Sequence, residues 1–200
     1  MSTSDTSPRI SPAPPEEIRP LLGGLFGGLD ATEAPAAAHI TANPVLNILA
    51  TVGNHPGLLT GLAPLLGAIS TGLLPARDRE LVILRVAWHT QARYEWAHHV
   101  VIADGAGLTE REIARIPQGP DEPGWGDRDA ALLRAVDELH GPGAAVSDET
   151  WRQLSSCYDH RQLLELLALT GTYTLVAYVL NSCRVPIDDW LRDPAALPEA

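Results

Sequence analysis

The segment Arg77–His99 places a helix-length apolar run directly before a cluster of acid/base side chains. Glu80 opens the run, and Leu81–Trp88 is apolar on almost every side, so we expect this stretch to lie in a core. A short polar step follows, and then come Tyr94, Glu95, Trp96, His98 and His99. Burial moves carboxyl and imidazole pKa values toward neutrality, and such groups carry out proton transfer.

The rest of the chain shows helical patterns and no convincing strand alternation, which predicts an all-α fold. Pro residues open two predicted helices, and Thr109 with Glu112 forms a capping box. Asp78 is a candidate cap for the helix that carries Glu80, and Thr90 for the helix that follows. Predicted helices cover residues 44–52, 56–73, 80–89, 90–103, 109–116, 128–140, 150–157 and 161–182.

Composition narrows the classes of partner. The formal charge is 14 − 25 = −11, and all the positive residues are Arg. Nucleic acids and anionic membranes need a basic surface, so we expect neither as a partner. The absence of Lys excludes Schiff-base chemistry and, with much Ala, Gly and Pro, indicates a bacterial source. We expect Cys157 and Cys183 to be free thiols in a reducing cytoplasm, because no secretion signal is visible.

The apolar stretch Leu163–Leu180 is long enough to raise the question of a membrane span. Glu165, three threonines and Gly171 interrupt it, so we predict a buried helix instead. Long apolar helices of small domains usually bury part of their surface against a copy of the same chain. The sequence therefore favours a homo-oligomer, as a dimer, trimer or hexamer.

The same segment resembles the alkylhydroperoxidase D-like (AhpD-like) superfamily, which includes the carboxymuconolactone decarboxylases. Its pattern is a Glu, a Cys twelve residues on, a second Cys after three more and a His after four more. Here these positions are Glu80, Ala92, Glu95 and His99. The phrases RELVILRVAW, YEWAHH, LLRAVDELH and GTYTLVAYVLN resemble the decarboxylase-like branch. The resemblance implies an AhpD-like helical domain over residues 41–185. We expect a flexible extension at 1–40 and a C-terminal tail at 186–200. The first 20 residues are rich in Ser, Thr and Pro, which predicts a mobile tail.

The residues at the two Cys positions decide between the chemistries of the superfamily. Peroxidase members use a dithiol pair, which Ala92 and Glu95 cannot supply. A residual peroxiredoxin-type activity would need Cys157 and Cys183 instead. The decarboxylase-like branch implies an acid/base site that needs no metal or organic cofactor. In that interpretation His99 is the main acid/base, Glu95 its partner or a second base, and Glu80 an orienting or proton-relay carboxylate.

Other residues are candidates for contact with a small substrate: Trp88, Tyr94, His98, Tyr173 and Asn181. The predicted function is that of a lyase or isomerase acting on a carboxylated or keto-enol compound, in aromatic catabolism or natural-product biosynthesis. The alternative is a non-catalytic interaction module without the cysteines. Glu80 could also be a first-turn carboxylate paired with Arg77 or Arg79, and Glu95–His99 a surface pair. No HExxH is present, so we predict no metal site.

Overall fold

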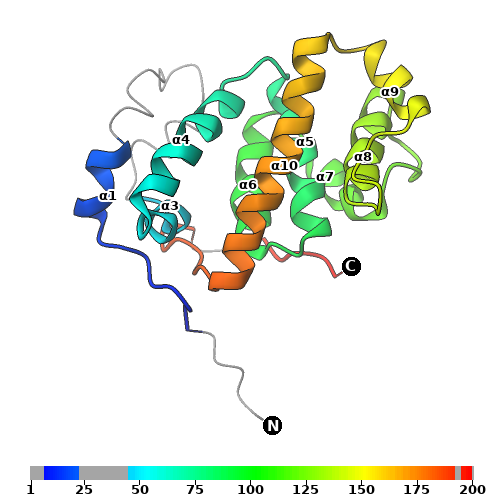
Figure 1. Cartoon of the computed structure of the whole chain (residues 1–200). Helices are drawn as coiled ribbons and strands as arrows, with labels where there is room; N and C mark the ends of the chain where they lie inside the picture. Colours follow the sequence, from blue (N-terminus) through cyan, green and yellow to red (C-terminus); the bar gives the residue numbers. More distant parts are fainter. Residues whose placement is uncertain (1–6, 23–44, 192–194, 200) are drawn as a thin grey trace. The chain divides into compact units, whose positions relative to one another are not determined.

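The computed structural model describes residues 7–22, 45–191 and 195–199, and every regular element in these ranges is helical. The chain divides into two compact units, of which the first comprises residues 1–71 and 178–193 and the second residues 72–177 and 194–200. Figure 1 shows the helices with their labels. The predicted all-α fold is confirmed.

The first unit holds α1 (Pro15–Leu22), α3 (Asn47–Gly53), α4 (Pro56–Ser70) and the end of α10 (His160–Cys183). Ile18 is buried, and its side chain fills the space beside Gly53 that a Cβ atom would occupy. The predicted mobile tail over residues 1–20 is therefore wrong for residues 15–20, because Ile18 anchors this segment as a helix. Residues 23–40 of the predicted flexible extension lie outside the described residues.

The second unit begins with α5 (Ala76–His89) and α6 (Arg93–Gly105), followed by α7 (Glu110–Arg115) and the 3₁₀ turn η1 (Ile116–Gln118). It continues through α8 (Asp127–Leu139), α9 (Asp148–Ser155) and most of α10. Side chains of α5 form much of the core, since Leu81, Val82, Leu84, Val86 and Ala87 are all fully buried. The apolar run of the sequence thus lies where its composition predicts.

Capping side chains agree with the sequence prediction at one helix and differ from it at two others. Thr109 and Glu112 form the predicted capping box of α7, and Ser147 caps α9. Asp78 is not a cap, because α5 begins after Pro75 and places Asp78 in its first turn. Thr90 is also not an N-cap: it ends α5, and its hydroxyl donates to the Val86 carbonyl.

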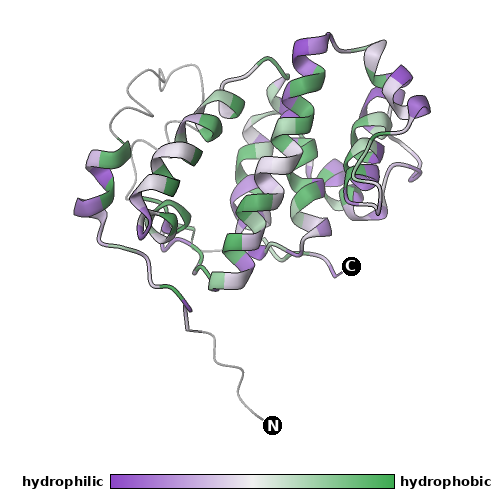
Figure 2. Cartoon of the chain, in the orientation of Figure 1, coloured by the Kyte–Doolittle hydropathy of each residue, from purple (hydrophilic) through white to green (hydrophobic). Residues whose placement is uncertain are grey.

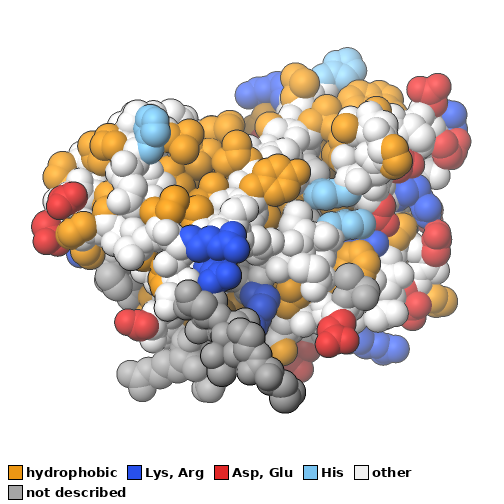
Figure 3. Space-filling model, turned by 60° about the horizontal axis from the view of Figure 1, so that its bottom comes forward, with side chains coloured by type: hydrophobic (Ala, Val, Ile, Leu, Met, Phe, Trp, Pro, Cys, Tyr) orange, Lys and Arg blue, Asp and Glu red, His pale blue; other side chains and the backbone are white. Residues whose placement is uncertain are grey.

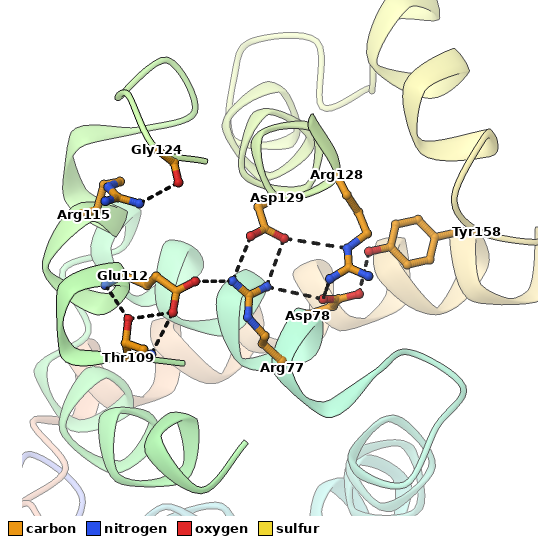
Figure 4. A network of polar contacts seen from close by, with 9 residues as sticks. All are labelled: Arg77, Asp78, Thr109, Glu112, Arg115, Gly124, Arg128, Asp129 and Tyr158. Carbon is orange, nitrogen blue, oxygen red and sulfur yellow. Dashed lines mark hydrogen bonds and ion pairs between the residues drawn. The ribbon is translucent and has the colours of Figure 1, made fainter. Parts of the chain in front are cut away.

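A partly buried network of charged groups fixes the start of α5 against α7 and α8 (Figure 4). The Arg77 guanidinium donates to both carboxylate oxygens of Asp129, at 3.0 and 2.8 Å, and to Glu112 at 2.5 Å. Burial alone would raise the pKa of Glu112, but hydrogen bonds from Thr109 and Arg77 outweigh it and lower that pKa to about 2. Asp78 accepts a hydrogen bond from the Tyr158 hydroxyl at 2.7 Å.

The long helix α10 passes the length and hydropathy test for a membrane span, with 44% of its most apolar window buried inside the structure. In Figure 2, hydrophobic and near-neutral residues dominate the visible side of this helix. Core helices of globular domains pass the same test. Tyr173 contacts α6 and Thr174 contacts His140 of α8, so this part of α10 packs within the second unit.

Candidate active site

A tight turn between α5 and α6 brings the two ends of the acid/base segment together. Thr90 closes α5, Gln91 adopts a left-handed conformation at φ 52°, and α6 starts after Ala92. The chain reverses over these residues, so α6 runs back along α5 and the two helices pack together. As a result, Glu80 near the start of α5 faces His99 in the second half of α6.

Glu80 and His99 form the central contact of the site. The Nδ1 atom of His99 lies 2.7 Å from Oε2 of Glu80. The Glu80 side chain is 2% exposed and that of His99 13%, so the pair is almost shielded from water. The other Glu80 oxygen lies 3.5 Å from Nε of Arg79. The carboxylate accepts the Nδ1 proton, which leaves Nε2 as the ring atom that can exchange a proton with a substrate.

Glu95, which the resemblance places at the second cysteine position, is buried with no hydrogen-bond partner among the described residues. Its side chain is on the first turn of α6, and the residue is 2% exposed. Neither carboxyl oxygen has a hydrogen-bond partner among the described residues. Burial raises the pKa of Glu95 well above its ordinary value. The alternative of a Glu95–His99 surface pair is wrong, and Glu80 is the hydrogen-bonding partner of His99.

Tyr173 brings α10 to the same place. Its ring meets the His99 imidazole edge to face, with 5.1 Å between the centroids. Burial raises the pKa of Tyr173 well above its ordinary value, and the nearby Glu80 carboxylate raises it further. The phenol therefore stays protonated and is a hydrogen-bond donor at the site. Three helices thus supply a carboxylate, an imidazole, a buried carboxyl group and a phenol.

The other predicted contact residues have contacts of their own. Tyr94 and His98 stack on each other at 4.1 Å between centroids, and His98 Nδ1 lies 2.8 Å from the Tyr94 carbonyl. Trp88 is two turns along α5 from Glu80. The guanidinium carbon of Arg85 lies over the Trp88 ring, 4.3 Å from the ring centroid. Asn181 is exposed and belongs to the first unit. Among these five residues, Tyr173 contacts the Glu80–His99 pair through the His99 ring.

A second polar cluster, which the sequence analysis missed, lies at the far end of α5. Arg85 donates to both oxygens of Asp137, at 2.6 and 2.9 Å, and His89 Nε2 is 2.6 Å from the same carboxylate. His140 stacks on His89 with 4.9 Å between centroids. An open groove of about 510 Å³ lies here, lined by Arg85, Gln118, Gly119, Pro120, Asp121, Arg134, Asp137 and Glu138. Glu80, Glu95 and His99 do not line this groove.

Comparison with known proteins points in the same direction as the fold. Residues 56–138 match the model of the carboxymuconolactone decarboxylase family. The helical fold is similar to that of AhpD-like structures. No curated protein matches the chain by sequence. Within the described residues, no group of three His, Cys, Asp or Glu side chains could hold a metal ion.

Solved structures share the fold at low sequence identity. An alkylhydroperoxidase AhpD core protein from Ralstonia eutropha JMP134 is 15% identical with a TM-score of 0.72, over 93% of this chain and 98% of that one. A variant of the debrominase Bmp8 in complex with 2,3,4-tribromopyrrole is 15% identical with a TM-score of 0.71, over 96% and 95%. ATU0492 from Agrobacterium tumefaciens, a protein of unknown function described as a putative antioxidant defence protein AhpD, is 18% identical with a TM-score of 0.62, over 68% and 94%.

Proposed function

We propose that this chain is a cofactor-independent lyase or isomerase that moves a proton at a carbon beside a carbonyl group. The substrate is a small carboxylated or keto-enol compound. The observation that carries the proposal is the Glu80–His99 hydrogen bond next to the buried, unpartnered carboxyl group of Glu95. Together these groups offer a base and an acid in one largely dry place, which is what enolate chemistry requires.

Each group has a distinct task in the proposed reaction. In an isomerisation, His99 Nε2 removes a proton from the carbon, and the electron pair moves to the carbonyl oxygen. Glu80 holds the ring and stabilises the imidazolium that forms, because its carboxylate accepts the Nδ1 proton. Glu95, whose pKa burial raises well above its ordinary value, is the proposed acid that donates to the enolate oxygen. The imidazolium then returns the proton at a second carbon.

A decarboxylation uses the same groups in another order. The bond between the carbon and the carboxylate breaks, carbon dioxide leaves, and its bonding electrons form the enolate. Glu95 and the Tyr173 hydroxyl stabilise the enolate oxygen, since both stay protonated donors. His99, as imidazolium, then protonates the carbon.

The unpartnered Glu95 also argues against the alternative of a non-catalytic module. A buried carboxyl group without a hydrogen bond destabilises a fold, and such groups are rare except where they serve a ligand or a reaction. A protein that had lost its chemistry would gain stability from an apolar residue at this position. Dithiol chemistry finds no support either, because Ala92 and Glu95 occupy the cysteine positions.

Proton exchange in D₂O tests the proposal before the natural substrate is identified. The protein is incubated with a panel of small 1,3-dicarbonyl compounds and β-keto acids, and deuterium uptake beside the carbonyl is followed by ¹H NMR. We expect catalysed exchange or decarboxylation of at least one compound, with His99→Gln reducing the rate by a factor on the order of 10²–10⁴. His160→Gln, which changes an exposed histidine, serves as the matched control. Equal rates for both variants would refute the role of His99.

A further inference from the structure

One of the arginines on α5 has far fewer partners than the other two. Arg77 and Arg85 each donate hydrogen bonds to carboxylates, at 2.5–3.0 Å. Arg79 makes no side-chain hydrogen bond to a described residue, and its polar contact is with Glu80, where Nε and Oε1 are 3.5 Å apart. In Figure 3 the blue side chains are arginines at the surface, where water can satisfy their donors. The Arg79 side chain is 14% exposed, so most of it has no such contact with water.

The unused donors of Arg79 lie at the candidate active site, within the second unit. Arg79 approaches one oxygen of Glu80, and the other oxygen of that carboxylate contacts His99. Burial raises the pKa of Tyr173, the Glu80 carboxylate raises it further, and the Arg79 charge lowers it, so the guanidinium is within electrostatic reach of the phenol. The Tyr173 hydroxyl also makes no hydrogen bond to a described residue, as is true of the Glu95 carboxyl group. Three possible donors near one another are thus left for a ligand.

We propose that Arg79 binds a carboxylate of the substrate and so selects keto acids over neutral ketones. This inference rests on the proposed function and adds which part of the substrate is held, and by which residue. A guanidinium donates two parallel N–H bonds to a carboxylate, which fixes the orientation of the ligand. A singly charged group suits this place better than a phosphate monoester, because the Glu80 carboxylate already puts a negative charge beside Arg79.

The carboxylate on Arg79 is not the one that leaves in a decarboxylation. Loss of carbon dioxide moves the charge of the leaving carboxylate to the enolate oxygen. A guanidinium on that carboxylate would therefore stabilise the ground state more than the transition state and slow the reaction. An isomerisation would accordingly act on a keto acid. A decarboxylation would act on a keto diacid, in which the carbon–carbon bond to the second carboxylate breaks and its electron pair forms the enolate.

Succinylacetone, a 1,3-diketone with a carboxylate at one end, and its methyl ester test the proposal. Deuterium exchange does not consume either compound, so calorimetry gives a Kd and ¹H NMR an exchange rate for the same protein. Wild type should prefer the acid to the ester by a factor on the order of 10–100 in both Kd and kcat/KM, the worth of a charge-assisted hydrogen bond. Arg79→Gln should reduce this ratio to about one, and Arg79→Lys should keep part of it. Any effect of Arg79 on Glu80 changes both compounds alike and cancels in the ratio.

Arg111→Gln is the matched control, since Arg111 is exposed on α7, and it should leave the ratio as in wild type. Circular dichroism checks that each variant is folded. A wild type that binds the acid no more tightly than the ester would overturn the inference, and so would a preference that Arg79→Gln retains. Exchange of both compounds without any dependence on Arg79 would leave the proposed function standing and remove the carboxylate site. Binding that depends on Arg79 without any exchange would support the carboxylate site and count against the proposed proton transfer.

Discussion

Replacing Glu95 by leucine should make the protein more stable while it removes the proposed acid. The carboxyl group of Glu95 is buried and neither oxygen finds a partner among the described residues. A buried polar group left without a hydrogen bond costs about 1–3 kcal/mol of folding free energy. Leucine has a similar volume and no polar atom. We therefore expect the free energy of unfolding to rise by about 2 kcal/mol, or roughly 4–8 °C in Tm for a chain of this size.

The stability that Glu95→Leu gains over wild type should increase as pH rises. The pKa of Glu95 is raised in the folded state above its ordinary value of 4.5. Above pH 4.5 the unfolded chain releases this proton while the folded protein keeps it, so wild-type stability falls as pH rises. The effect is absent below pH 4.5 and complete above the folded-state pKa. Within that window, the difference between Glu95→Leu and wild type should grow by up to about 1.4 kcal/mol per pH unit.

Urea unfolding followed by circular dichroism, at several pH values from 4 upward, measures this difference. Glu95→Gln is an informative second variant, because its amide cannot titrate but is still unpartnered. It should lose the pH dependence, so it should resemble wild type near pH 4 and exceed it above pH 4.5, without the further gain that an apolar side chain gives. Glu122→Leu controls for hydrophobicity, since Glu122 is exposed in a loop and should change stability by less than about 0.5 kcal/mol. A Glu95→Leu protein less stable than wild type at neutral pH would show that Glu95 has a structural partner, and would refute this reasoning.

Three further predictions concern the contacts around this site and the fold. Arg77→Ala should lower the free energy of unfolding by roughly 2–3 kcal/mol in a urea titration, because it leaves its carboxylate partners partly buried and uncompensated. Arg134→Ala is the control: its carboxylate partner is exposed, so the loss should be less than about 0.5 kcal/mol. Cys157→Ser with Cys183→Ser should leave catalysed proton exchange unchanged, and loss of turnover would contradict the acid/base proposal. Glu80→Gln should reduce the rate of proton exchange at least tenfold and should change the pH–rate profile. An unchanged profile would show that Glu80 does not act through His99.

The sequence predicted the helices well because their signals are local. Apolar periodicity and the capping box at Thr109 depend on residues a few positions apart, and both appear in the structure. Asp78 and Thr90 show the limit of such reasoning. Asp78 is a residue type that often caps helices. In the structure its carboxylate instead accepts a hydrogen bond from Tyr158, eighty residues later. Such distant partners are set by how the helices pack, which a local pattern does not contain.

The site was predictable in its members but not in its contacts. Helical spacing placed Glu95 and His99 on one face and suggested that they pair. In the structure His99 instead meets Glu80, nineteen residues earlier, because the turn at Gln91 folds α6 back along α5. The unpartnered state of Glu95 and the separate cluster around Asp137 depend on the surroundings that neighbouring helices create. Neither could be derived from spacing alone.

A carboxyl ¹³C NMR titration of Glu95 tests the central claim most directly. The signal can be assigned from the spectrum of Glu95→Gln, in which it is absent. A buried acid that donates to an enolate must be protonated at neutral pH, so we predict an apparent pKa well above 4.5. A Glu95 carboxyl that titrates at its ordinary value, and is ionised at pH 7, would contradict the proposed site.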